Sequence, residues 1–259
     1  MYDGEFLNGK QHGKGKYSLP NGFNYEGEWR EGKIEGFGIA KYQDGSLYEG
    51  NFVDGQPSGQ GKLIFPDGTF YEGNWLQGKF NGKGFYKHSN DISLEGNFLD
   101  GLLNGKGMQI NSNGYTYEGD WQLGKKTGIA VIKYDGGGTY QGEVLNGVRQ
   151  GSGKLTLIDG SVLEGFFNNG TISGKGSIKY SNGDSYIGEL LNNNLEGQGI
   201  KKFASGSSYE GKFKDNLFDG YGVYKTKDDY QAEGKWVNGQ IQGKGKITYP
   251  DLSVYNGEL

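Results

Sequence analysis

The chain has 259 residues, a formal net charge of −4 at pH 7 and no cysteine, which excludes disulfide bonds, thiolate metal ligands and cysteine nucleophiles. Its 52 glycines would suit a disordered chain, but 14% of its residues are aromatic, and disordered segments contain few aromatic residues. The start, MYDGEFLNGK, has no apolar run of the signal-peptide type, and GIAVI at 128–132 is too short to cross a bilayer. We therefore expect a cytoplasmic protein.

A repeat of 23 residues runs through the whole chain without insertion or deletion. Units start at residues 2, 25, 48, 71, 94, 117, 140, 163, 186, 209 and 232, and a partial unit covers 255–259. Glycine occupies five positions of this frame, namely the third, eighth, twelfth, fourteenth and twenty-first, and only Gly136 and Gly138 lie outside them. This regularity predicts one continuous array of structural repeats over residues 1–259.

Each unit is expected to contain two strands, as the unit that starts at Tyr25 illustrates. Its first segment, YEGEWRE at 25–31, and its second, GFGIAKY at 36–42, both alternate with a period of two, which favours β-strands. In the first segment, Tyr25, Gly27 and Trp29 share one face, and Glu26 and Glu28 point to the other. We expect an antiparallel hairpin in each unit, connected directly to the next.

Two turns separate these strands. The first lies at positions seven and eight, as in Asn8-Gly9, and the second at positions 20 and 21, as in Asp44-Gly45. Such dipeptides favour tight turns with positive φ. Where the eighth residue is not glycine it is Asn193 or Asn216, and asparagine tolerates the same left-handed backbone.

The remaining glycines lie within the strands, where the aromatic rings at positions one and five could pack over them. Aromatic cover over strand glycines stabilises sheets. Acidic residues at position two and lysines at position seventeen could form ion pairs on the other face, although a solvated polar face is the simpler interpretation. The fold class that we predict is all-β, an elongated, single-layer antiparallel meander of about eleven hairpins that forms a curved or twisted rod.

The unit YEGEWREGKIEGFGIAKYQDGSL resembles the MORN repeat (membrane occupation and recognition nexus), with its Tyr-x-Gly-x-Trp/Phe, a following glycine and Gly-x-Gly. The resemblance covers the whole chain, and it implies a curved antiparallel sheet with an aromatic-lined face. It also implies a non-enzymatic scaffold of a ciliary axoneme, such as a radial spoke, or of another cytoskeletal assembly. Leu94, Leu163 and Ala232 depart from the pattern at position one, where the array could bend, meet a partner or simply have drifted.

A scaffold of this kind would bind other proteins, as a helix or an extended segment along its aromatic face. Trp and Tyr are frequent anchors of protein interfaces. The alternative interpretation is that the rings only hold the sheet together. The candidate contact residues are Tyr25, Trp29, Tyr48, Phe52, Tyr71, Trp75, Tyr117, Trp121, Tyr209, Phe213 and Trp236.

The sequence contains no motif that supports catalysis, cofactor binding or nucleic-acid binding. The Gly-Lys pairs lack the following Ser or Thr of a phosphate loop, and the two histidines, His12 and His88, lie in separate units. Carboxylates recur in every unit, whereas an active site would be expected once. We therefore expect no enzyme, no cofactor and no metal. With two arginines and an excess of acidic residues, we also expect no nucleic-acid partner.

A module that tethers phospholipid at a membrane–cytoskeleton junction is the alternative function. It would need a polybasic patch or an amphipathic anchor, and the sequence contains neither. The sequence as given starts and stops inside a unit, so we also expect an open sheet edge to pair with a partner strand or with a second copy.

Overall fold

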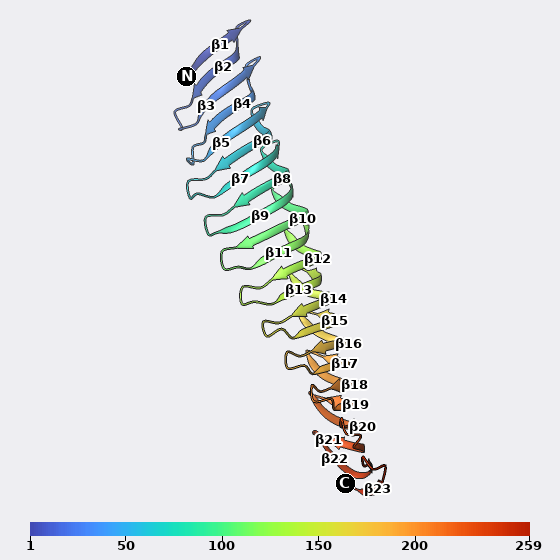
Figure 1. Cartoon of the computed structure of the whole chain (residues 1–259). Helices are drawn as coiled ribbons and strands as arrows, with labels where there is room; N and C mark the ends of the chain where they lie inside the picture. The colour runs from blue at the N-terminus through green and yellow to red at the C-terminus, as the bar shows by residue number, and fades with distance from the viewer. The chain divides into compact units, whose positions relative to one another are not determined.

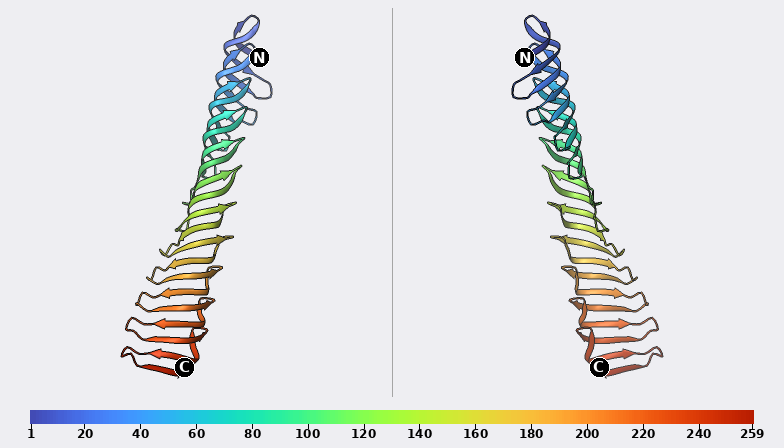
Figure 2. Two further views of the ribbon diagram at one scale, coloured as in Figure 1. Left: turned by 90° about the vertical axis from the view of Figure 1, so that its right-hand side faces the viewer. Right: turned by 90° about the vertical axis from the view of Figure 1, so that its left-hand side faces the viewer.

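The computed structural model describes all residues from Met1 to Leu259 and contains 23 β-strands and no helix. The chain divides into two compact units, residues 1–128 and residues 129–259. In each unit the strands follow one another in chain order and form a single layer (Figures 1 and 2). The prediction of an all-β chain built from antiparallel hairpins, one per repeat, is confirmed.

The first unit contains the following strands: β1 (Tyr2–Leu7), β2 (Lys10–Ser18), β3 (Asn24–Arg30), β4 (Lys33–Lys41), β5 (Leu47–Val53), β6 (Gln56–Ile64), β7 (Phe70–Leu76), β8 (Lys79–Lys87), β9 (Ile92–Leu99), β10 (Leu102–Asn111) and β11 (Thr116–Gln122). Each pairs antiparallel with the next along the chain. Strand β12 (Lys125–Lys133) contains the division between the units.

The second unit repeats this arrangement with β13 (Thr139–Leu145), β14 (Val148–Thr156), β15 (Val162–Asn168), β16 (Thr171–Lys179), β17 (Ser185–Leu191), β18 (Asn194–Lys202), β19 (Ser208–Lys214), β20 (Leu217–Lys225), β21 (Gln231–Val237), β22 (Gln240–Thr248) and β23 (Val254–Glu258). Successive strands from β13 to β23 are again antiparallel.

Both predicted turns are present in every repeat. At the first turn, the residue at position seven has positive φ whether it is Asn8 (51°) or Leu123 (46°). Asn193 and Asn216, at position eight, have φ of 71° and 70°, so the predicted left-handed conformation is confirmed. The second strand of the hairpin starts earlier than expected, at Lys33 instead of residue 36, because pairing resumes beyond an irregularity in the ladder.

That irregularity is a β-bulge, and it explains the glycine at position twelve. In the hairpin of β3 and β4, Gly27 pairs with Gly38 and Trp29 with Ile34, so that Glu28 has no partner on this side of the ladder. Gly36, at position twelve, has φ of 72°, which an L-residue adopts only at a cost. The glycines at positions three and fourteen have another role, because they stand opposite one another across successive strands.

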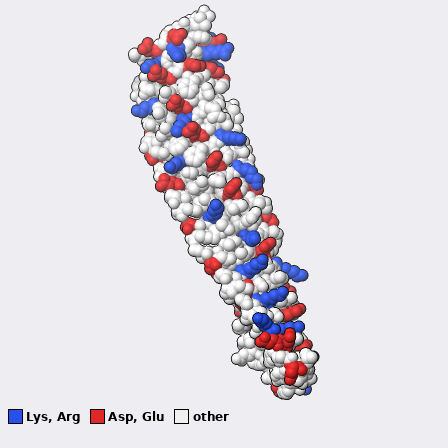
Figure 3. Space-filling model, in the orientation of Figure 1, with Lys and Arg blue, Asp and Glu red and all other residues white.

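The side chains divide between two faces. The ring face carries positions one, five, ten and sixteen, for example Tyr25, Trp29, Ile34 and Ala40, and it contains the buried core. The opposite face carries charged and polar residues together with scattered exposed apolar ones such as Phe37. Acidic and basic side chains are interspersed on the surface that Figure 3 shows.

Candidate functional site

The eleven candidate contact residues all lie on the ring face and are all buried by the chain itself. Their exposed fractions range from 0% for Tyr48 to 8% for Trp236. Their surfaces are therefore covered before any partner arrives, by one another and by neighbours such as Phe80 and Phe98. Partner binding through these residues stays a prediction.

The rings form an alternating ladder that crosses from one repeat to the next. Tyr25 makes edge contacts with Trp29 of its own repeat, at 5.6 Å between ring centroids, and with Phe52 of the next, at 5.3 Å. Tyr209 lies between Phe213 and Trp236 in the same way, at 5.1 and 5.5 Å. Edge-to-face pairs of this kind each add roughly 0.5–1.5 kcal/mol beyond area burial. The ladder thus stabilises the contact between neighbouring repeats.

The tyrosine hydroxyl at position one donates to the backbone carbonyl at position four, beside the bulge. Tyr25 Oη donates at 2.9 Å to the carbonyl oxygen of Glu28, which stands opposite the bulged residues 35–37 of the next strand. The same bond recurs in other repeats, for example from Tyr71 to Asn74 at 2.9 Å and from Tyr186 to Glu189 at 2.7 Å. Burial of these rings raises the pKa of Tyr71 and of Tyr186 to about 12. Phenylalanine at position one would leave this carbonyl without its donor.

All four tryptophans bind back to the preceding repeat. The indole Nε1 of Trp75 donates to the carbonyl oxygen of Gly61 at 3.0 Å, and that of Trp236 to Gly222 at 3.1 Å. Trp29 and Trp121 donate to Gly15 and Gly107 at 3.3 and 3.1 Å. Every acceptor is a glycine at position fourteen, one repeat earlier.

The three repeats that lack tyrosine at position one fill its place with other side chains. The ring would have covered the strand glycines, and aliphatic side chains lie there instead. In these repeats the residues at position ten, Leu103, Ile172 and Ile241, approach the glycines at position three. Leu103 and Ile172 are only 3% and 0% exposed. The departures from the pattern are therefore compensated locally within the core.

Polar residues at position eleven bind the first turn of the following repeat. The backbone N–H of Asp54 donates to Glu35 Oε2, that of Leu123 to Asn104 Oδ1 and that of Asp215 to Glu196 Oε2. Sequence reasoning missed this role. The available signal is that position eleven is polar in every repeat.

Ion pairs on the opposite face cross repeat boundaries, but they do not involve the lysines at position seventeen that the sequence suggested. Lys16 pairs with Glu26 at 3.0 Å, and Lys62 with Glu72 at 3.0 Å. These lysines occupy position fifteen, which the register places directly opposite the acid at position two. The pairs are largely exposed, so each contributes little to stability.

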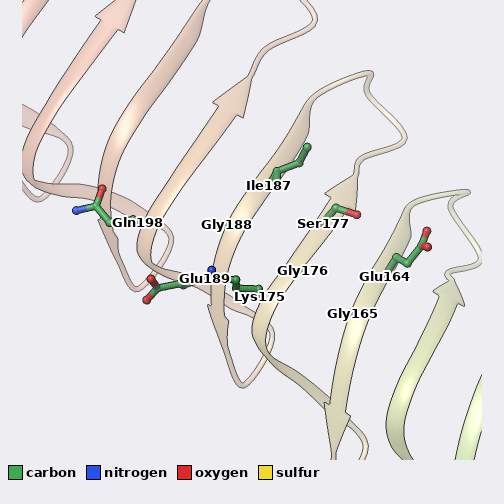
Figure 4. A pocket seen from close by; sticks show the side chains of 9 residues that line it. All are labelled: Glu164, Gly165, Lys175, Gly176, Ser177, Ile187, Gly188, Glu189 and Gln198. Atoms are coloured by element: carbon green, nitrogen blue, oxygen red, sulfur yellow. The ribbon is translucent and has the colours of Figure 1, made fainter.

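A shallow hollow on the opposite face spans β15 to β18 (Figure 4). Its floor is the backbone of Gly165, Gly176 and Gly188, and charged and polar side chains, including Lys175 and Glu189, stand around it. Opposite charges at its rim give it no strong preference for one sign of ligand.

A deeper groove of about 720 Å³ lies on the ring face of the second unit. Buried aliphatic side chains form its floor, among them Leu155, Leu163, Ile178 and Leu195. Its polar lining consists of Arg149, Asp159, Ser161, Tyr180, Asn193, Asn194, Lys201 and Asn216. Apolar surface with a few polar groups at the rim is typical of sites that bind another molecule. None of the eleven candidate residues lines this groove.

Position ten carries a cation in two repeats: Arg149 in the second unit and Lys126 in the first. Lys126 Nζ lies 4.7 Å from the ring centroid of Tyr115, 4.8 Å from that of Tyr117 and 5.5 Å from that of Trp121. It also donates to Tyr115 Oη at 3.0 Å. Burial lowers the pKa of Lys126 to about 8.

No cluster of three or more His, Asp and Glu side chains in residues 1–259 is suited to a metal ion.

Comparison with solved structures finds only weak likeness. The TCP10 domain of Danio rerio CPAP, in complex with a peptide of STIL, is 12% identical over 100% of both chains, with a TM-score of 0.34. The TCP10c domain of Drosophila melanogaster Sas-4 is 14% identical over 69% of this chain and 99% of that one, with a TM-score of 0.37. Both TM-scores are too low to establish a shared fold. No curated protein matches the chain. The structure contains no helix that could span a membrane.

The sequence model of the MORN repeat, by contrast, matches almost the whole chain. The matched segments are residues 2–23, 25–47, 48–70, 71–91, 95–114, 117–139, 140–162, 164–185, 186–208, 209–229 and 233–254. The segments that start at 95, 164 and 233 begin one residue late, just after Leu94, Leu163 and Ala232. The chain belongs to the MORN repeat family.

Proposed function

We propose that this protein is a non-enzymatic scaffold that binds other proteins along its ring face, within a ciliary axonemal or other cytoskeletal assembly. The observation that carries the binding role is the groove of the second unit, with its aliphatic floor and polar rim. MORN repeats serve generally as interaction scaffolds, and the cytoskeletal setting follows from the resemblance to axonemal members of the family.

The regular hairpins suit this role because each repeat presents the same backbone with different exposed side chains. The buried rings fix the spacing of the repeats, and the residues around them are free to vary. The partner surface is thus assigned to the side chains that flank the ladder, at positions eight to ten and sixteen to twenty-two.

Fractionation of cells that express the tagged full chain tests the proposal. Extraction with detergent and then salt should leave the protein in the cytoskeletal pellet, and chemical cross-linking there should join it to other proteins. Complete release by mild detergent, together with flotation on phosphatidylserine vesicles at physiological salt, would instead support the membrane-tethering function and would refute the scaffold.

A further inference from the structure

Lys201 is a cation at a position that is otherwise almost entirely apolar or aromatic. Position sixteen faces the core, and Gln109 is the only other residue there that is neither aliphatic nor tyrosine. The register places Lys201 between Tyr186 and Tyr209, both fully buried. Its Nζ lies 5.6 Å from the ring centroid of Tyr180 and 5.0 Å from that of Phe203.

The groove that contains Lys201 is lined by two cations, Lys201 and Arg149, and by one carboxylate. Neither Lys201 nor Arg149 takes part in any ion pair of the chain. The one acid of the lining, Asp159, already accepts hydrogen bonds from Ser161 at 2.8 and 2.9 Å and from Ser181 at 3.2 Å. With two cations and one carboxylate, the lining has a net positive charge that suits an acidic ligand, although the whole chain has a net negative charge.

Arg149, at the same groove, is held in place rather than free to swing into solvent. Its Nη2 and Nε donate to the carbonyl oxygen of Gly170 at 2.6 and 3.2 Å, and its Nη1 to Tyr134 Oη at 3.3 Å. Its guanidinium also lies 5.8 Å from the ring centroid of Phe167. A cation positioned in this way binds a carboxylate at a smaller entropic cost than a mobile one.

The rest of the lining favours an extended peptide over a helix. Asn216 Nδ2 donates to Asn194 Oδ1, and Asn193 Oδ1 accepts from the backbone of Ile172, but the Nδ2 groups of Asn193 and Asn194 donate to no acceptor in the chain. These amides can bind the backbone carbonyls that an extended segment leaves open and a helix uses internally. Leu163, in place of the usual tyrosine, contributes aliphatic surface below them.

We propose that this groove binds an extended protein segment that combines aliphatic side chains with carboxylates, and that one carboxylate pairs with Lys201 and another with Arg149. The inference rests on the proposed scaffold function and specifies the chemistry of its partner. The aliphatic side chains cover the floor formed by Leu155, Ile178 and Leu195.

A matched pair of variants tests the inference on the full chain. Lys201→Glu reverses the charge in the groove, whereas Lys202→Glu reverses an exposed charge on the next residue, which points to the opposite face. Lys201→Met removes the cation and restores the apolar character of position sixteen. It therefore separates the effect of losing the charge from a folding defect of Lys201→Glu. Far-UV circular dichroism checks that all three variants fold like the native chain.

The probe is a library of short random peptides displayed on phage and selected on the native protein. Selected peptides should combine Asp or Glu with Leu, Ile or Val. Lys201→Glu should weaken their binding by about tenfold or more, and Lys202→Glu should change it less than about twofold. Lys201→Met should fall between the two.

The inference is overturned if no peptide is selected, if the selected peptides are basic or lack carboxylates, or if Lys201→Glu binds them as well as Lys202→Glu does. Binding to phosphatidylserine vesicles that Lys201→Glu abolishes would also overturn it, in favour of a lipid ligand. If proteins in the cytoskeletal pellet still cross-link equally to Lys201→Glu, this inference fails while the scaffold function stands. If nothing cross-links to the native chain, the scaffold function itself fails.

Discussion

The ring of Tyr186 lies against the Cα of Gly199, on the neighbouring strand of the same hairpin. A Cβ atom added to Gly199 would lie 2.5 Å from Cε2 and 2.6 Å from Cζ of that ring, closer than real Cβ contacts. The same fit recurs between Tyr25 and Gly38 and between Tyr209 and Gly222. Glycine at position fourteen and tyrosine at position one are therefore one structural unit.

Gly199→Ala should lower the free energy of unfolding by roughly 1–3 kcal/mol, because the tyrosine must leave its place between the repeats. Urea denaturation, followed by tyrosine and tryptophan fluorescence, measures the change. Gly136→Ala is the control, since a Cβ there meets no atom within 4 Å and its φ is not positive. A loss as small as that of the control would show that the ring adapts freely.

The same pair can be tested for coupling. In the repeat of Leu163, which lacks the ring, the atoms nearest to a Cβ added at Gly176 belong to Glu164, Leu190 and Ile172, and none belongs to the residue at position one. The double variant Tyr186→Leu with Gly199→Ala should therefore be more stable than the sum of the two single losses predicts. Strict additivity would mean that the two positions do not act together.

Stability should fall steeply in alkaline solution because the buried tyrosines resist ionisation. Burial raises the pKa of Tyr71, Tyr140, Tyr186 and Tyr209 to about 12, whereas an unfolded tyrosine ionises near 10. Above pH 10 the unfolded state therefore releases protons first, and the contribution present below pH 10 is lost between pH 10 and 12.

Tyr186→Phe isolates one of these groups. At neutral pH it should cost about 1 kcal/mol, because the carbonyl of Glu189 loses its donor. From pH 10 to 12 the difference from the native chain should shrink, since the variant no longer has this group to titrate. Urea denaturation midpoints of both proteins at several pH values measure this difference in stability. A difference that stays constant with pH would contradict the raised pKa of Tyr186.

Much of the fold could be predicted from the sequence because the repeat presents each local rule many times. Asn-Gly and Asp-Gly indicated the turns, and Asn193 and Asn216 fitted the left-handed backbone. Alternation assigned the faces, and the rings do pack over strand glycines. These properties depend on residues close together in sequence.

The bulge could not be predicted from the sequence, because the glycine at position twelve could equally have been a strand glycine covered by an aromatic ring. The positive φ of this glycine, and the hydrogen bond from tyrosine to the carbonyl opposite the bulge, become visible only once the strands are paired. The groove is also a product of register, since Arg149 and Lys201 belong to different repeats. Lysine at an otherwise apolar position is the signal for the groove that the sequence contains.

Trp75→Phe should destabilise the chain by about 1 kcal/mol. Phenylalanine already occupies position five in other repeats, for example as Phe52, so the ring itself is tolerated. What is lost is the bond from Nε1 to Gly61, whose carbonyl is then left without this donor. Thermal unfolding monitored by circular dichroism provides the measurement. Equal stability of both proteins would show that this bond between repeats contributes nothing net.

Leu123→Asn should stabilise the protein by about 0.5–1 kcal/mol, because leucine is held at φ of 46° in the first turn, where asparagine is less strained. Leu123 is 55% exposed, so little apolar burial is lost. Asn146 and Asn238 occupy the same turn position in other repeats with φ of 51°. Leu76→Asn, an equally exposed leucine with ordinary φ, is the control and should give no gain. A decrease in the urea midpoint for Leu123→Asn would refute the strain argument.

Leu103→Ala should cost about 2–4 kcal/mol, which is the usual range for a leucine removed from a closed core. Leu103 fills the place left by the missing tyrosine of its repeat, and its Cδ2 lies close to the backbone of Gly96 and Gly107. The neighbouring Leu102 is 48% exposed, so Leu102→Ala should cost far less and serves as the matched control. Similar urea midpoints of the two variants would show that Leu103 does not replace the missing tyrosine. The departure of this repeat from the pattern would then need another explanation.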